Sequence, residues 1–265
     1  MGLLLKFTLA GLALMSALIA VLALAQTALL FPRALVGPLP AMPADTRDLR
    51  LERPGGEVLH GHLIPGSDPR LPVLLGFGGN AWNAGAVAFF LHQIAPAHTV
   101  VAFHYRGYAP STGRPSAAAL LSDAEAVFDL MAAQGDTGMI AVGFSIGSGV
   151  AAHLAATRPL RGVVLVTPFD RLSRVAQASF PFAPVGLLFR HEMDAESALA
   201  ATTANVALIL AARDEVIPPA RAEALAIALP DADVTRIDAG HNDIYNHPAF
   251  AMTLRSAIAG ISERN

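Results

Sequence analysis

The longest apolar stretch of the chain lies at its N-terminus. Residues 7–31 are apolar apart from small or mildly polar side chains such as Gln26 and Thr27, and no charge interrupts them. At 1.5 Å per residue, a helix of this length crosses a hydrocarbon core of roughly 30 Å. The pattern predicts that residues 1–31 form a membrane anchor.

A cleaved signal peptide is the alternative, because Ala23 and Ala25 before Gln26 form a small-x-small cleavage pattern. We favour the anchor, since the run is longer than a signal-peptide core and continues past this point. A buried core helix is the weakest interpretation, because the run shows no polar face. Lys6 precedes the run and Arg33 follows it. This weak charge asymmetry favours a catalytic domain on the outer, periplasmic face of the membrane. If the N-terminus is instead cleaved as a signal peptide, the protein would be secreted.

Beyond the anchor, four prolines within residues 32–47 predict a short extended linker, and residues 48–265 alternate strands with helices. Apolar runs predict strands at 49–52, 58–64, 73–77, 99–104, 139–144, 162–166, 206–211 and 234–237. Helices are predicted at 84–94, 116–133, 146–157, 220–229 and 248–261. The first two strands flank a Pro-Gly-Gly turn and predict a hairpin. The fold class is therefore α/β, one domain with a mostly parallel sheet covered by helices on both faces.

Composition narrows the function classes. The 265 residues carry a net charge of −3 without a basic run, which excludes a nucleic-acid-binding surface. No cysteine is present, so thiol catalysis, disulfides and cysteine-based metal sites are excluded.

The strongest chemical motif follows the strand at 139–144. Residues 143–147 read Gly-Phe-Ser-Ile-Gly, which matches G-x-S-x-G, and a predicted helix opens at Ile146. This strand–turn–helix context is the one in which such a serine is a nucleophile, because the sharp turn exposes it at the head of a helix. Ser145 is therefore the predicted nucleophile.

A serine nucleophile needs a base and an acid. In α/β-hydrolases, the fold in which this serine turn is typical, they follow the serine along the chain in the order acid, histidine. Asp214 comes directly after the strand at 206–211 and is the predicted acid, with its neighbour Glu215 as the rival. His241 follows the last predicted strand in a Gly-His-Asn context and is the predicted base. All three lie at carboxyl strand ends, where ligands bind in parallel sheets.

The glycine-rich loop at 76–80 predicts half of an oxyanion hole. In this fold the loop donates one backbone N–H and the residue after the nucleophile, Ile146, donates the other. Gly79 and Asn80 are both candidates for the first donor. The same loop also fits the dinucleotide pattern G-x-G-x-x-A, with Arg106 available for a 2′-phosphate, but that alternative explains neither the serine nor the histidine motif.

The other histidines do not predict a metal site. His60 and His62 share a strand face without an evident third ligand. His191 precedes Glu192, but the second histidine of H-E-x-x-H is missing. We expect no metal and no cofactor.

Taken together, these motifs resemble the membrane-anchored α/β-hydrolases of the Bem-type (bud-emergence) family, which are grouped with serine aminopeptidase-like hydrolases. The resemblance covers nearly the whole chain. It rests on Leu-Phe-Pro at 30–32, Tyr-Arg-Gly-Tyr-Ala-Pro-Ser at 105–111, the serine motif continued to 149, Asp-Glu-x-x-Pro at 214–218 and Gly-His-Asn-Asp at 240–243. It implies ester or thioester hydrolysis without a cofactor.

This chain departs from the family pattern in two places. Phe-Gly-Gly-Asn at 77–80 stands where the family has His-Gly-Asn, which leaves the first oxyanion donor open. His104 stands where the family has an acidic or amide residue before its Tyr-Arg-Gly-Tyr run.

Residues 170–200 lie between two strands, where this fold inserts its lid, and we call them the lid segment. The lid segment is rich in Phe, Leu and Pro, which beside a membrane anchor suits a lipid-like acyl ester as the small-molecule substrate. The alternative is that these residues only pack the lid segment on the domain. The sequence thus predicts a membrane-bound serine hydrolase that forms an acyl-enzyme. An aminopeptidase-like peptidase and a catalytically silent binding protein of the same fold are the alternatives.

Overall fold

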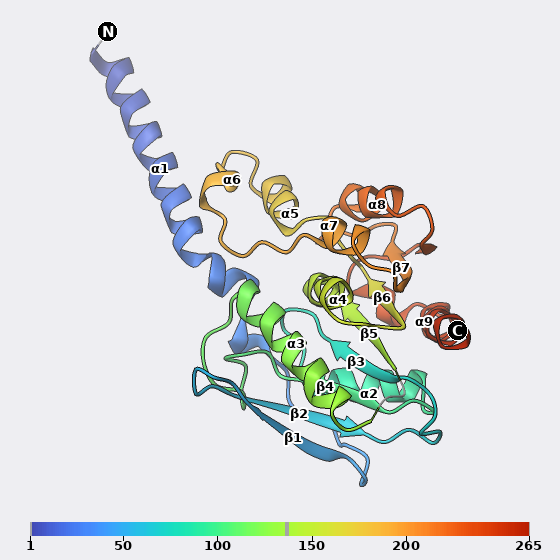
Figure 1. Ribbon diagram of the computed structural model, residues 1–265. Coiled ribbons are helices and arrows are strands. Elements are labelled where there is room, and N and C mark those ends of the chain that lie inside the picture. Colours follow the sequence, from blue (N-terminus) through green and yellow to red (C-terminus); the bar gives the residue numbers. More distant parts are fainter. Residues whose placement is uncertain (1, 136–137, 265) are drawn as a thin grey trace.

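The computed structural model describes residues 2–135 and 138–264, so Met1 of the predicted anchor and Asn265 at the end of the predicted domain lie outside it. Its centre is an eight-stranded sheet (Figure 1) in the order β1-β2-β4-β3-β5-β6-β7-β8. The strands are β1 (Arg47–Glu52), β2 (Val58–Ile64), β3 (Val73–Phe77), β4 (Val100–Phe103), β5 (Met139–Phe144), β6 (Gly162–Val166), β7 (Asn205–Ala211) and β8 (Asp233–Ile237).

The sheet is parallel except at one edge. β1 pairs antiparallel with β2, and β2 pairs antiparallel with β4, while the remaining neighbours are parallel. The hairpin predicted at the start of the domain and the mostly parallel sheet are both confirmed. The strand bounds agree with the sequence pattern to within two residues.

Helices cover both faces of the sheet, as predicted. The longer ones are α2 (Ala84–Ile94), α3 (Ala117–Ala132), α4 (Ile146–Thr157), α8 (Pro219–Ala228) and α9 (Phe250–Glu263). Apolar residues of α3, α4 and α8 pack in one core, and those of α2 and α9 pack in a second core on the opposite face. The strands between them are buried on both sides, which explains why β5 and β6 read as unbroken apolar runs.

The lid segment lies between β6 and β7. It contains the short helices α5 (Leu172–Ser179), α6 (Val185–Leu188) and α7 (Ala195–Ala200). Arg171, near its start, forms an ion pair with Asp194, which lies just before α7. At its start, the fully buried carboxylate of Asp170 pairs with Arg174 at 2.9 Å and with Arg221 of α8 at 3.1 Å. These ion pairs fasten the base of the lid segment to the domain.

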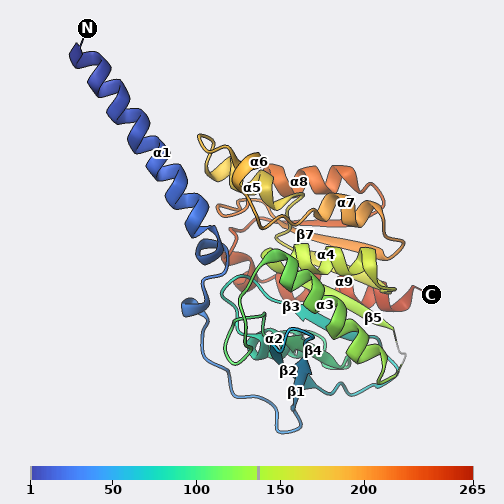
Figure 2. The same ribbon diagram turned by 60° about the vertical axis from the view of Figure 1, so that its left-hand side comes forward.

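The N-terminal helix α1 (Gly2–Leu30) projects away from the domain and lies beside the lid segment near its C-terminal end (Figures 1 and 2). Among the described residues it belongs to the only helical stretch long and apolar enough to cross a membrane, a test that a signal sequence also passes. Its last turns carry contacts that the apolar pattern did not predict. Gln26 is buried, and Phe31, just after the helix, joins the domain core.

The predicted linker at 32–47 begins with a short 3-10 helix, η1 (Arg33–Leu35), and then follows the surface of the domain. Val36 packs against the core of α3 and α4, and Met42 packs against the core of α2 and α9. The side-chain amide of Asn83, which also caps α2, donates a hydrogen bond to the Gly37 carbonyl at 3.1 Å. After η1 the segment is held against the domain at several points.

Candidate active site

Ser145 occupies a strained turn between β5 and α4. Its backbone lies at φ 53° and ψ −121°, a region that non-glycine residues rarely adopt. Its N–H donates to the Val166 carbonyl of the neighbouring strand at 3.0 Å, which holds the turn in place. The side chain is partly exposed at the N-terminus of α4, where the helix dipole favours a developing negative charge.

The two glycines of the G-x-S-x-G motif are required by close packing. A Cβ atom on Gly143 would lie 2.4 Å from the Gly147 carbonyl oxygen, and one on Gly147 would lie 2.2 Å from the Phe77 carbonyl oxygen. Neither position has room for any side chain. The motif therefore encodes the tight approach of β5, α4 and the loop after β3.

The structure brings Ser145, His241 and Asp214 together in one hydrogen-bonded row. His241 Nε2 lies 2.9 Å from Ser145 Oγ, and His241 Nδ1 lies 2.7 Å from Asp214 Oδ2. His241 is only 5% exposed and Asp214 only 7%. The other carboxylate oxygen, Asp214 Oδ1, accepts the backbone N–H groups of Val216 at 2.9 Å and Ile217 at 2.7 Å. We assign the proton on Nδ1, because that nitrogen faces a carboxylate and leaves Nε2 free to accept from the serine hydroxyl.

Glu215, the rival acid, faces the backbone of the histidine. Its Oε2 accepts the main-chain N–H of His241 at 3.0 Å, and this hydrogen bond lowers the pKa of the Glu215 carboxyl. Asp214 therefore occupies the position beside the imidazole ring, and Glu215 holds the loop that carries it. The sequence did not predict this second role.

Two tyrosine hydroxyls hold the loop after β3 by hydrogen bonds to its carbonyl groups. Tyr105 donates to the Gly78 carbonyl and Tyr108 donates to the Asn80 carbonyl, each at 2.7 Å. Burial raises the pKa of both phenols, so both stay protonated and act as donors at neutral pH. A peptide group is planar, so fixing the Gly78 carbonyl also fixes the direction of the Gly79 N–H.

Three backbone N–H groups near the serine remain available. A Cβ atom built on Gly79 would lie 3.7 Å from Ser145 Cβ, so this loop runs directly beside the serine. Across residues 2–135 and 138–264, the N–H groups of Gly79, Asn80 and Ile146 have no hydrogen-bond partner. Both candidates for the first oxyanion donor thus stay open, as does Ile146 for the second.

The geometry contradicts the dinucleotide alternative. In that motif a helix opens within the glycine loop, whereas α2 begins only at Ala84. Arg106 is also engaged, because its guanidinium pairs with Asp123 and, at 2.8 Å, with Glu57. It therefore supports the turn beside the loop and does not face it as a phosphate ligand.

His62 and His191, the histidines weighed as metal ligands from the sequence, have protein partners. His62 Nδ1 lies 3.0 Å from Asp48, and its ring packs edge-on against the ring of His104. His191 lies 2.7 Å from the hydroxyl of Thr27 on α1. In the part of the chain that the structure describes, no three His, Asp or Glu side chains gather in a way that could hold a metal ion.

Comparisons with known proteins agree with this architecture. Residues 71–187 match the α/β hydrolase fold family. The uncharacterized protein Rv2307c of Mycobacterium tuberculosis is 32% identical over 226 residues, which cover 80% of this chain and 79% of that protein. The lysophosphatidylserine lipase ABHD12 of Xenopus tropicalis is 32% identical over 123 residues, 43% of this chain and 32% of the lipase.

Solved structures share the fold at low sequence identity. The esterase Pf2001 of Pyrococcus furiosus superposes with a TM-score of 0.66 at 16% identity and covers 85% of this chain and 97% of that structure. The α/β hydrolase domain-containing protein 10 from mouse gives a TM-score of 0.60 at 18% identity, with 81% and 98% covered.

The chain therefore belongs to the α/β hydrolase family. Its relatives include a lipase, and its structural neighbours include an esterase. The comparisons thus indicate a hydrolase of this general kind. The narrower resemblance to the bud-emergence type stays a prediction.

Proposed function

We propose that this protein is a serine hydrolase that cleaves carboxylic ester or thioester bonds through an acyl-enzyme intermediate. The observation that carries this proposal is the row Ser145–His241–Asp214, with separations of 2.9 and 2.7 Å, in which the histidine and the aspartate are buried. A buried, hydrogen-bonded imidazole beside a partly exposed hydroxyl is the arrangement that activates serine.

In the proposed reaction, His241 Nε2 takes the proton of Ser145 as Oγ attacks the carbonyl carbon of the ester. The negative charge that develops on the carbonyl oxygen is bound by the N–H of Ile146 and by that of Gly79 or Asn80. Asp214 holds the Nδ1 proton and stabilises the imidazolium. His241 then protonates the leaving alkoxide or thiolate, and a water molecule releases the acyl group by the same steps in reverse order.

We propose further that α1 anchors the protein in a membrane, with the catalytic domain on the outer face, and that the substrate is a lipid-like acyl ester. The contacts of Gln26 with the lid segment support retention of the helix. Its side chain donates to the Leu188 carbonyl at 3.1 Å and accepts the N–H of Arg190 at 2.8 Å. Cleavage after Ala25 would place a new terminus in this docked turn. The match to a lysophosphatidylserine lipase, which spans 32% of that enzyme, supports a lipid-like ester.

A fluorophosphonate probe tests the central claim. We expect the full chain in detergent micelles to be labelled, and Ser145→Ala and His241→Ala to be unlabelled, because only an activated serine reacts with the probe. Ser148, which is buried on the same helix, offers the matched control Ser148→Ala, which should still be labelled. A folded wild-type protein that is not labelled would favour a silent binding protein of the same fold.

A further inference from the structure

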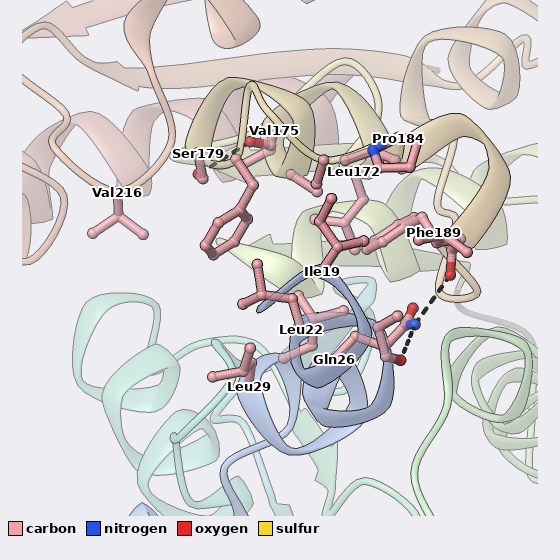
Figure 3. A pocket seen from close by; sticks show the side chains of 17 residues that line it. Ile19, Leu22, Gln26, Leu29, Leu172, Val175, Ser179, Pro184, Phe189 and Val216 are labelled. Atoms are coloured by element: carbon pink, nitrogen blue, oxygen red, sulfur yellow. Dashed lines mark hydrogen bonds between the residues drawn. The ribbon is translucent and has the colours of Figure 1, made fainter. Parts of the chain in front are cut away.

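An apolar groove lies between α1 and the lid segment. It has a volume of about 290 Å³ and is lined by Leu22 and Ala23 of α1, by Val175 and Phe189 of the lid segment, and by Val216 of the loop that carries Asp214. Figure 3 shows side chains of α1 facing those of α5 and of the segment after α6 across this groove. The groove is thus built from three parts of the chain that are far apart in sequence.

The polar side chains of the groove are already paired. Only Gln26 and Ser179 among the lining residues have polar side chains. Gln26 uses its amide on Ala23, Leu188 and Arg190, and the Ser179 hydroxyl donates to the Val175 carbonyl at 3.1 Å. No side-chain donor in the lining is left to bind a polar ligand, and the rest of the lining is apolar, so the groove favours a flexible hydrocarbon.

The wall contributed by α1 is a specific face of the helix. The lining positions Ile19, Leu22, Ala23 and Gln26 recur at the spacing of one helical face. This face is fixed to the lid segment by the Gln26 contacts and by Thr27 Oγ1, which lies 2.7 Å from His191. A helix that served only as a tether would need no such polar contacts.

The groove lies at the level where a bilayer would end. Counted from Phe7, the first residue after Lys6, about 20 residues of helix cross the roughly 30 Å of a hydrocarbon core, which then ends near Gln26. The α1 residues of the lining run from Ile19 to Leu30, on both sides of that point. Beside it, the lid segment exposes Leu187 at 86% and Phe182 at 45%. An acyl chain in the membrane would therefore meet the groove without crossing water.

One residue of the lining lies in the loop that carries Asp214. Val216 lines the groove, and its N–H donates to Asp214 Oδ1 at 2.9 Å. We propose that α1 and the lid segment together form the binding site for the acyl chain of a membrane-held ester, so that the N-terminal helix is one wall of the substrate site. This inference rests on the proposed hydrolase function and adds the source and path of the substrate.

Chain-length dependence tests the groove in the full protein. We would reconstitute it in vesicles of diether phosphatidylcholine, which contain no ester bond, and measure kcat/KM for 4-nitrophenyl esters from acetate to laurate. Each buried methylene is expected to raise kcat/KM by up to about fourfold until the groove is filled. A profile that does not rise with chain length would overturn the proposal.

Two matched pairs of variants locate the effect. Ala23→Trp and Ala176→Trp place a large side chain in the groove, whereas Leu24→Trp and Ala178→Trp place it on exposed neighbouring positions outside the lining. We expect the groove variants to lose at least about tenfold on laurate and less than twofold on acetate, and the controls to match wild type. Because each wall is tested separately, misfolding of one variant leaves the other informative. Equal profiles for groove and control variants would contradict the proposal.

A binding measurement separates this proposal from the hydrolase assignment. In Ser145→Ala, lauric acid with a terminal diazirine should crosslink within residues 172–189, and Ala23→Trp, but not Leu24→Trp, should abolish this crosslink. If the wild type hydrolyses no ester but the crosslink forms, the proposed function fails and the groove stands. If esters are hydrolysed but the crosslink is absent from the lid segment, the groove proposal fails alone.

Discussion

The carboxyl ends of β5, β7 and β8 present a polar row of side chains, whereas the groove beside α1 presents almost only apolar surface. In the first region each group is fixed by hydrogen bonds to a defined atom, as His241 is by Ser145 and Asp214. In the second, the walls are apolar, and polar contacts of Gln26 and Thr27 help to set the position of the helix. Changes in the polar row should therefore alter the rate of reaction, and changes at the helix should alter stability and substrate choice.

The largest expected effect separates the two neighbouring acids. Asp214→Asn should lower kcat about 10⁴-fold, because an amide at this position favours the wrong histidine tautomer. Glu215→Gln should lower it about tenfold or less, because Glu215 binds only the main-chain N–H of His241. Steady-state hydrolysis of a 4-nitrophenyl ester by both variants measures the loss of kcat in each. Similar losses would mean that the two carboxylates share the role of the acid.

A second prediction concerns how the stability of the folded protein depends on pH through His104, which follows β4. Burial, with the nearby His62 and His60, lowers the pKa of His104 from 6.5 to about 4. Below pH 6.5 the unfolded chain binds a proton that the folded chain does not, so stability falls as pH drops towards 4. Between pH 7 and 4.5 this costs about 2 to 3 kcal/mol.

His104→Asn should remove this part of the acid sensitivity. The measurement is the difference in Tm between pH 7 and pH 4.5 for each protein in the same detergent, which cancels any effect of the substitution that does not depend on pH. The drop should be smaller in the variant by roughly 5 °C or more. Equal drops would show that the His104 ring is protonated in the folded protein at pH 4.5.

The helix–lid contact gives the third prediction. Gln26→Leu keeps the helix apolar but leaves the Leu188 carbonyl and the Arg190 N–H without their partner, which should cost about 2 kcal/mol. Thr8→Val is the control, because the Thr8 hydroxyl bonds only to its own helix in an exposed position. Thermal unfolding in micelles should show a Tm lower by about 4 to 8 °C for the first variant alone. Equal Tm values would make α1 a loose tether.

The smallest expected effect lies in the loop beside the serine. Tyr108→Phe removes the donor that holds the Asn80 carbonyl, and kcat should fall about tenfold with little change in KM, since the loop is expected to act on the transition state. Phe103→Leu, on the preceding strand, is a control for packing. A fall in Tm without a fall in kcat would assign Tyr108 a structural role only.

These two regions also differ in what could be predicted from the sequence. The strands and most helices follow from the apolar runs, and Ser145, Asp214 and His241 each stand in a short motif after a strand. From the sequence alone Glu215 is a rival acid, because the direction of its side chain depends on the fold of the loop. Gln26 and Thr27 looked like tolerated polar residues in an apolar run, since their partners Leu188 and His191 are more than 160 residues away.

The segment at 32–47 has a consequence for motion as well as for position. A free proline-rich tether would let the domain turn independently of the helix, but Val36 and Met42 pack against the two cores and Asn83 binds Gly37. With α1 also fixed to the lid segment, helix and domain rotate as one body. In a bilayer the rotational diffusion of the whole catalytic domain is then set by the viscosity of the lipid around a single helix.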